Sequence, residues 1–415
     1  MSPCPGREPH VVFPSNEPQH ATGPGAVVWR AAGDCPGGAG ARVAPIGNFQ
    51  VSGTPASAAV GHEAAVGLQG PLAVGSAPTG QVAVIGRPTG AAATSAVALQ
   101  GHAGGTFSAI QPEPVFAAPF AATNGYLGDL AVAGATPGGQ LQLQVERFYA
   151  TSFGRRSVVA GGPGVRLLTP ALDYRSDAML VWERAGSIFA QYLPASGAEG
   201  QPQRLGAAGA NLRISALLSD DRRAIVVWSQ QQGAVTDVYL DRSGKDVAFG
   251  SPKLLESFRN PSATPPPLAS PSLIRLSTES VMVAWSSIAR GRWVIRSAAV
   301  DQERVGPPTT TSSRTGDALL ADLQPGPRAE AMLLWTEPGR SGKGPGGVPE
   351  QAIYAARAFR GVGSRVVFEA PEQLAATGLN SEPVVGVDPD TDRAVAVWRQ
   401  GQLLHYAVRE PVPER

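Results

Sequence analysis

The feature that most constrains the fold is a short pattern recurring along the chain, a run of small or aliphatic residues that ends in tryptophan. Six of the seven tryptophans in the 415 residues stand at the end of such a run. They are Trp29, Trp182, Trp228, Trp285, Trp335 and Trp398. Because self-similarity at a regular spacing indicates a repeat architecture, the chain is expected to contain several copies of one structural unit.

The spacing of the copies indicates the size of the unit. Successive repeat tryptophans from Trp182 to Trp398 are 46 to 63 residues apart. Two weaker copies fill the longer interval after Trp29, with Ile85 and Ala133 in the tryptophan position. A unit of about 40–50 residues that holds several short strands is typical of a β-propeller blade. We therefore predict an all-β fold, a β-propeller of four-stranded antiparallel blades, with eight blades favoured and seven as the alternative.

The local pattern favours strands over helices throughout. The apolar segments are short, and the 50 glycines and 38 prolines interrupt the chain too often for long helices. The run before each tryptophan is apolar on both faces, as expected for a strand in a sheet packed between two neighbours. Two consecutive units are predicted to have strands at 270–276, 281–285, 293–300 and 305–310, and at 318–323, 331–335, 352–358 and 366–374.

The two ends of the chain are predicted to meet. Residues 8–13 resemble residues 382–387, the predicted first strand of the last unit. The chain stops soon after a third strand at 403–408, so the last unit lacks its outer strand unless the N-terminal segment supplies it. Closing the ring with strands from both ends would hide edges that otherwise invite aggregation.

The continuous repeat predicts one propeller domain over residues 1–415. Residues 1–7 are expected to be an N-terminal tail. The stretches 260–271 and 338–349, rich in proline or in Gly, Ser and Pro, are expected to be exposed loops. Propellers usually carry function on loops at one rim, so these loops are candidates for ligand contact.

Composition excludes some classes of partner. The formal net charge is +1 and only 16% of residues are charged, so no basic surface for nucleic acid is expected. No apolar run approaches the ~20 residues that span a bilayer. The first residues lack the apolar core of a signal peptide. We therefore expect a monomeric protein that is secreted or at the cell surface if a signal peptide precedes this start, and cytoplasmic otherwise.

The two cysteines, Cys4 and Cys35, leave two alternatives open. They form a disulfide that ties down the N-terminal segment, or they are two unrelated free thiols. No Cys-x-x-Cys motif is present, which excludes a zinc site built from cysteine pairs.

Four residues are candidates for ligand binding. Arg30, Glu183 and Arg399 directly follow repeat tryptophans, and equivalent positions in a ring of repeats are expected to converge on a shared rim. The equivalent residues of other units are uncharged, which argues against a strongly charged site. Trp293, the one tryptophan outside the pattern, is a candidate ligand contact.

A metal site is considered at Asp388, Asp390 and Asp392. Alternate carboxylates in a tight loop can converge on calcium, which takes six to eight oxygen ligands. However, no glycine follows and no bidentate acid stands at the usual spacing. The corresponding segments 219–223 and 174–177 are typical of hairpin turns in which a side chain binds its own backbone. We therefore expect no cofactor, with calcium as the alternative.

The unit from Asp388 to Trp398 and its counterparts resemble the degenerate propeller repeats of secreted bacterial proteins that are related, at fold level, to sialidase-type propellers. A sialidase would have Asp-boxes of sequence Ser-x-Asp-x-Gly-x-Thr-Trp, and no copy is present; 241–246 is only a polar glycine turn. A sialidase would also have an arginine triad and a tyrosine paired with an acid, and no residue of this sequence is assigned to those roles. The resemblance therefore implies a fold and not an activity.

The expected function is a non-catalytic binding or surface-interaction scaffold, whose partner is a protein or a carbohydrate. The alternative is a glycan-active hydrolase or lyase of the sialidase-like propeller type. That alternative predicts carboxylates and arginines that converge at the mouth of the central channel.

Overall fold

The structure is a computed structural model, and every regular element in the part of the chain it describes is a β-strand. It describes residues 10–12, 26–30, 41–45, 56–57, 64–65, 68–76, 81–88, 96–102, 106–110, 115–124, 129–136, 138–147, 153–158, 164–196, 198–259, 271–277, 280–301, 304–312, 317–326, 330–338, 350–360, 366–388, 393–400 and 403–409. Among these residues no helix is long and apolar enough to cross a membrane.

The strands of the first half form two sheets. The first sheet contains β1 (His10–Val12), β2 (Ala26–Arg30), β3 (Ala41–Pro45) and β5 (Ala64–Ala65). The second contains β6 (Leu68–Ser76), β7 (Gln81–Pro88), β8 (Ala96–His102), β9 (Phe107–Ala109), β10 (Val115–Asn124), β11 (Leu130–Ala135), β12 (Leu141–Glu146) and β13 (Gly154–Val158). It consists of two four-stranded meanders, which are joined where β10 pairs with β8.

The strands of the second half form five sheets of the same antiparallel pattern. Three of them are β14 (Val165–Leu172), β15 (Ala178–Arg184), β16 (Ser187–Leu193) and β17 (Gln203–Ala207); β18 (Ala210–Leu218), β19 (Ala224–Gln232), β20 (Val235–Arg242) and β21 (Lys253–Arg259); and β22 (Ser272–Ser277), β23 (Ser280–Ala289), β24 (Arg292–Asp301) and β25 (Thr309–Thr310). The others are β26 (Leu319–Gly326), β27 (Glu330–Pro338), β28 (Gln351–Arg360), β29 (Val366–Phe368) and β30 (Glu372–Gly378); and β31 (Asn380–Val387), β32 (Ala394–Gln400), β33 (Leu403–Arg409) and β4 (Ala56–Ser57).

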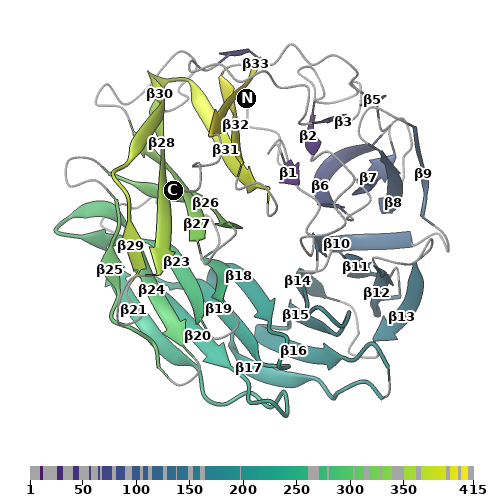
Figure 1. Ribbon diagram of the computed structural model, residues 1–415. Coiled ribbons are helices and arrows are strands. Elements are labelled where there is room, and N and C mark those ends of the chain that lie inside the picture. The colour runs from purple at the N-terminus through teal and green to yellow at the C-terminus, as the bar shows by residue number, and fades with distance from the viewer. Residues whose placement is uncertain are drawn as a thin grey trace.

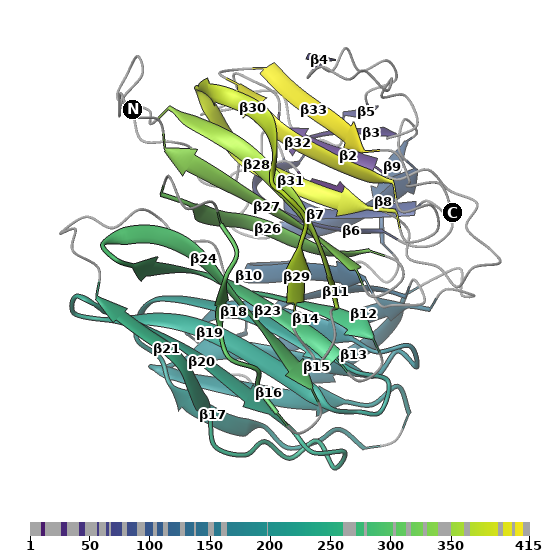
Figure 2. The same ribbon diagram turned by 60° about the vertical axis from the view of Figure 1, so that its left-hand side comes forward.

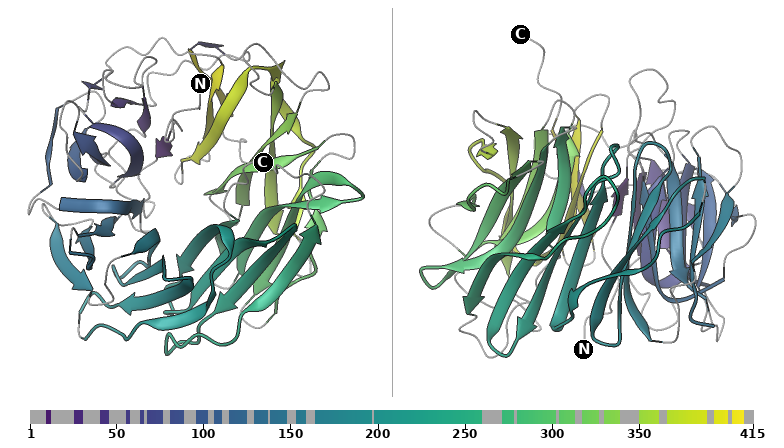
Figure 3. Two further views of the ribbon diagram at one scale, coloured as in Figure 1. Left: turned by 180° about the vertical axis from the view of Figure 1, so that it is seen from behind. Right: turned by 90° about the horizontal axis from the view of Figure 1, so that it is seen from below.

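These sheets are arranged around a ring, with the first strand of each unit toward the centre and the fourth toward the outside (Figure 1). The first strands β1, β6, β10, β14, β18, β22, β26 and β31 are neighbours in turn, and β31 lies beside β1. The views in Figures 2 and 3 show the sheets following one another around this ring. The predicted β-propeller of four-stranded antiparallel blades is confirmed. The count of eight blades stays a prediction, because two of the meanders are hydrogen-bonded into one sheet.

The N-terminal segment supplies the outer strand of the last unit. β4 pairs antiparallel with β33, with Ser57 opposite His405 and Ala56 opposite Tyr406. The first and last parts of the sequence therefore share one sheet, as the missing fourth strand suggested. The pairing covers the backbone edge that β33 would otherwise expose.

The repeat tryptophans pack between sheets. Trp182, Trp228, Trp285, Trp335 and Trp398 each expose at most 1% of their surface. Four of them stack on a ring directly opposite on the third strand, with centroids 5.5 to 6.1 Å apart; these rings are Phe189, Tyr239, Tyr354 and His405. Ile85 and Ala133, which replace tryptophan in the weaker copies, are fully buried as well. The side chain of Trp29 lies outside the described residues.

A second recurring pattern sets the outermost strand, and the sequence analysis missed it. Pro-x-x-Leu occurs at the outer strands of three units, at 202–205, 252–255 and 371–374. In each copy the leucine is an extra, unpaired residue in the ladder between third and fourth strands, which is a β-bulge. The bulge turns the leucine toward the next sheet, and Leu205 is 4% exposed there.

Candidate functional site

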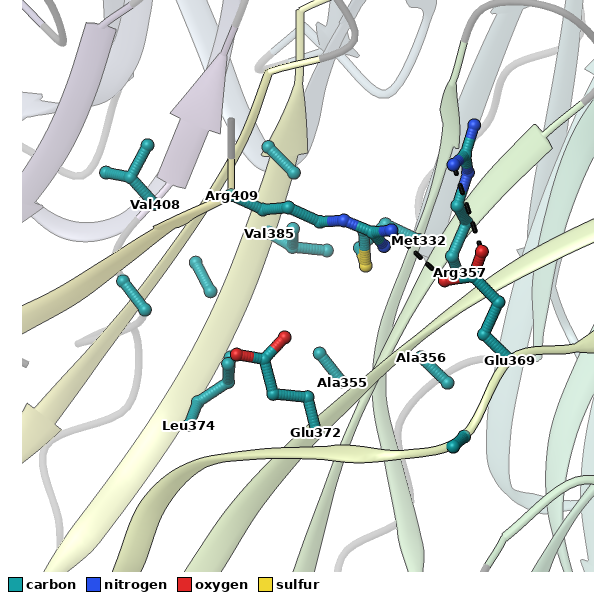
Figure 4. Close-up of a pocket in the computed structure, with 14 residues that line it drawn as sticks. Met332, Ala355, Ala356, Arg357, Glu369, Glu372, Leu374, Val385, Val408 and Arg409 are labelled. Carbon is teal, nitrogen blue, oxygen red and sulfur yellow. Dashed lines mark hydrogen bonds and ion pairs between the residues drawn. The ribbon is translucent and has the colours of Figure 1, made fainter. Parts of the chain in front are cut away.

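A groove lies between the β26–β30 sheet and the β31–β33 sheet (Figure 4). Its volume is about 260 Å³, close to the lower end of the ~300–1,000 Å³ typical of small-molecule sites. Strands of both sheets and the connection between β29 and β30 form its walls.

Small and aliphatic side chains form the floor of this groove. Five alanines from both sides contribute to it: Ala355, Ala370, Ala394, Ala396 and Ala407. Met332, Leu374, Val385 and Val408 complete the apolar lining. Packed sheets stand about 10 Å apart, so methyl groups facing each other leave space that larger side chains would fill.

The corresponding interface between the β14–β17 sheet and the β18–β21 sheet is filled. In that interface Tyr192 takes the place of Arg357. Tyr192 is three residues after Phe189, which pairs with Trp182, and Arg357 is three residues after Tyr354, which pairs with Trp335. Val247 and Phe249, from the segment after β20, belong to the apolar cluster that fills this interface. The groove is therefore open because alanines and an arginine occupy places that bulky side chains fill in the other interface.

Four charged side chains line the groove, and three of them are paired. Arg357 donates to Glu330 through Nε at 2.6 Å. The Glu369 carboxylate pairs with Arg409 at 3.1 Å and with Arg357 at 3.9 Å. Glu372 is directed toward the middle of the groove, and no hydrogen bond or ion pair of its carboxylate is found within the described structure (Figure 4). The two carboxylates and the two guanidinium groups that line the groove balance in formal charge.

The two groove carboxylates stand on either side of a break in the outer strand. The sequence predicted one strand at 366–374, but β29 pairs with the end of β28 and β30 with its start. Between them Pro371 has no N–H to donate to the ladder, so pairing is interrupted. Glu369 and Glu372 flank this break.

A second polar cluster surrounds the turn between β14 and β15. The Asp173 carboxylate is fully buried and accepts the backbone N–H of Arg175 at 2.8 Å and of Asp177 at 2.9 Å. Burial raises the pKa of Asp173 to about 6, and the nearby Asp177 and Asp220 carboxylates act in the same direction, against the two backbone donors. A hairpin turn was expected at 174–177, and the Asp173 side chain closes it by accepting these two backbone hydrogen bonds.

The contacts of this cluster join neighbouring sheets. Ser176 donates to Asp129 of the preceding unit, and Arg222 of the following unit forms an ion pair with Asp177 at 3.6 Å. The Tyr192 hydroxyl also donates to Asp177, and burial together with this hydrogen bond raises the pKa of Tyr192. Because Asp173 and Asp177 are buried and bonded internally, the cluster fastens sheets and presents no open carboxylate to a ligand.

Two of the predicted rim residues lie buried within their own sheets. Glu183, at 1% exposure, accepts two hydrogen bonds from Arg166, at 2.5 and 2.9 Å, and one from the backbone N–H of Gly186 at 2.9 Å. The Arg166 guanidinium holds the pKa of Glu183 below its usual value. Arg399 is 5% exposed and belongs to the β31–β33 sheet. Arg30 is in β2, and its side chain lies outside the described residues. That these three share a ligand-binding rim stays a prediction.

Trp293, the fourth predicted ligand contact, is partly buried in β24. Its ring meets Phe258 edge-on, with centroids 6.0 Å apart, in the core between two sheets. Its role as a ligand contact likewise stays a prediction.

The metal and disulfide predictions fall mostly outside the described residues. Asp390 and Asp392 are not described, and neither are Cys4 and Cys35. The backbone N–H of Asp388 donates to the Arg393 carbonyl at 2.8 Å. Among the residues the structure describes, no group of three or more His, Cys, Asp or Glu side chains could hold a metal ion. Most residues of the predicted loops 260–271 and 338–349 are also not described.

The groove residues were not among the sequence candidates. Arg357 lies within β28, Glu369 between β29 and β30, Glu372 at the start of β30 and Arg409 at the end of β33, so these residues form no local motif. An alignment of the units could have pointed to one of them. Pro202 and Pro371 each start a Pro-x-x-Leu copy, and the residue after the proline is Gln203 in one copy and Glu372 in the other.

No family model matches the sequence, and no curated protein matches it. The structure is similar to the β-propeller domain of the Trilobed protease from Pyrococcus furiosus, with 9% identity and a TM-score of 0.44 over 82% of this chain and 98% of that one. It is also similar to the six-bladed fungal lectin of Aleuria aurantia, with 12% identity and a TM-score of 0.37 over 75% and 98%. A Hadza microbial sialidase matches with 10% identity and a TM-score of 0.36 over 68% and 63%. Likeness at this level assigns no ligand or activity to this chain.

Proposed function

We propose that this protein is a non-catalytic binding module that takes its ligand in the groove between the β26–β30 and β31–β33 sheets. The observation that carries the proposal is the apolar groove itself, which is bordered by the exposed carboxylate of Glu372 and by two ion-paired arginines. An apolar site with a few oriented polar groups is the usual form of a ligand pocket.

The walls of the groove support binding because they need little reorganisation. The Arg357 side chain is 14% exposed and is held by Glu330 and Glu369, so its position is set before a ligand arrives. The alanines of the floor have no rotamers to order. Both features lower the entropy cost of association.

The charge pairing favours binding over glycan hydrolysis, the alternative function. A glycosidase needs two carboxylates placed on either side of the bond it breaks. Glu369 is held by Arg409 and Arg357, which leaves Glu372 as the one groove carboxylate with no described partner. The carboxyl group of Asp173, whose pKa is about 6, lies buried in a turn of another sheet.

The proposal is tested by screening the full chain against glycans, peptides and small molecules while product formation is followed. A groove ligand should raise the melting temperature of the protein, by an amount that grows with ligand concentration. Ala396→Phe fills the floor and should abolish this shift. Ala355→Phe, on the facing sheet, should do the same. Ala376→Phe, an exposed position on β30, is the matched control and should leave the shift intact.

Two results would contradict the proposal. Turnover of any screened substrate at the groove would show catalysis. Binding that persists unchanged in both groove-filling variants, with the melting temperature of the free protein preserved, would place the ligand elsewhere.

A further inference from the structure

Glu372 has an internal counterpart in Gln203. Each residue directly follows the proline of a Pro-x-x-Leu copy, and each stands at the same place in its ladder. Gln203 is opposite Ala190 on β16, and Glu372 is opposite Ala355 on β28. The backbone therefore presents these two side chains in the same way, each beside the interface with the next sheet.

Gln203 binds the backbone of a neighbouring segment. Its Nε2 donates to the Val247 carbonyl at 2.9 Å, and its Oε1 accepts the backbone N–H of Phe249 at 2.9 Å. The apolar side chains of both residues pack in the space between the sheets. One interface of this protein thus already holds a peptide segment by a side-chain clamp and two apolar contacts.

The exchange of glutamine for glutamate changes which segment can be held. A carboxylate accepts hydrogen bonds but cannot donate one, so Glu372 can receive a backbone N–H but would repel a carbonyl placed like that of Val247. A cationic group of the ligand beside the other carboxylate oxygen of Glu372 would replace the carbonyl and avoid this repulsion. The Glu372 carboxylate has no ion-pair partner among the described residues, so its negative charge is available to such a cation.

The floor of the groove can take the apolar part of such a segment. Ala355, Ala396 and Ala407 leave room in this interface, as in the place that Val247 and Phe249 fill in the other one. A side chain of that size would cover the alanines and displace water from them, which is favourable at about 25 cal/mol per Å² of apolar surface.

We infer that the groove binds an extended peptide segment of a partner protein, with an apolar side chain over the alanine floor and a lysine or arginine paired with Glu372. This inference rests on the proposed function and names its ligand class.

The test uses two synthetic peptides with the sequence of residues 243–250, acetylated and amidated so that only side-chain charge differs. The basic probe carries Asp246→Lys and the acidic probe carries Lys245→Glu. The full chain should bind the basic probe about tenfold more tightly, because a charge-assisted hydrogen bond is gained. Glu372→Gln should remove most of this preference. Lys253→Gln, the exposed equivalent residue on β21, is the matched control and should leave it unchanged.

The outcomes separate this inference from the proposed function. If glycans bind, Ala396→Phe abolishes that binding and neither peptide binds, then the peptide inference is wrong and the binding module stands. If no ligand of any class depends on the groove, both are wrong.

Two further results would identify another occupant and overturn the inference. If the basic probe binds only after residues 410–415 are removed, the chain's own terminal segment competes for the groove. If sedimentation shows a dimer of the full chain that Glu372→Gln dissociates, a second copy occupies it.

Discussion

Asp173 and Glu183 are buried carboxylates of neighbouring elements, and their surroundings move their pKa values in opposite directions. Burial of Asp173 disfavours its charged form, and two nearby carboxylates act in the same direction. Glu183 faces the Arg166 guanidinium, so its charged form is favoured. The sequence marked Glu183 by its place after a tryptophan, but its role as the partner of Arg166 depends on the pairing of β14 with β15.

Asp173→Asn should remove a pH dependence of stability. The folded pKa of about 6 exceeds the ordinary 3.8, so the folded state prefers the protonated acid and loses stability as pH rises between these values. The full effect is roughly 3 kcal/mol. Relative to the unchanged protein, the variant should therefore gain stability between pH 4 and pH 8. Urea unfolding of both proteins at the two pH values measures this, and an equal difference at both would contradict it.

Glu183→Gln should show the opposite pH dependence. The folded pKa of Glu183 is lowered, so its stabilising contribution is present at neutral pH and is lost as pH falls through that lowered value. The substitution should cost about 1–2 kcal/mol at pH 7, since it weakens charge-assisted bonds to Arg166. Its cost should shrink in acid. A cost that stays constant from pH 7 to pH 3 in denaturant titrations would argue against the ion pair.

At the scale of elements, short apolar runs predict strands well because each run must be buried on both faces. The predicted strand 331–335 corresponds to β27, and 352–358 corresponds to β28. The predicted strand 366–374 is instead two strands, because Pro371 cannot join the ladder and Leu374 bulges out of it. Proline and bulge positions depend on the facing strand, which a single apolar run does not reveal.

The bulged leucines should be far more sensitive than their neighbours. Leu205→Ala should destabilise the protein by about 2–4 kcal/mol, because it opens a cavity between two sheets. Leu254→Ala, one residue before the equivalent bulge and 47% exposed, should cost less than about 1 kcal/mol. Thermal or urea unfolding of the two variants provides the comparison. Equal costs would show that the bulge does not direct the leucine inward.

At the scale of the whole molecule, the ring depends on a contact between distant parts of the chain. β4 completes the sheet of β31–β33, and β1 lies beside both β31 and β6. Long-range closure of this kind protects edge strands, and it also links the stability of the last sheet to the N-terminal segment.

Removal of residues 1–60 should therefore expose β33. We expect faster amide hydrogen exchange in residues 403–409 and concentration-dependent association, because an uncovered edge pairs with other chains. Removal of residues 1–7 alone should have little effect on either measurement. Unchanged exchange in β33 after the longer deletion would show that β4 does not protect it.

The hydrophobic pattern and its spacing were enough to predict a propeller, because every unit must bury the same two faces against its neighbours. That constraint is local and repeats, so even Ile85 and Ala133 were recognisable in the tryptophan position. The groove depends instead on differences between units. Arg357, Glu372 and Arg409 form one site only where two particular sheets pack without bulky side chains between them. Packing of distant strands decides which interface is filled and which stays open, and no local run of residues carries that information.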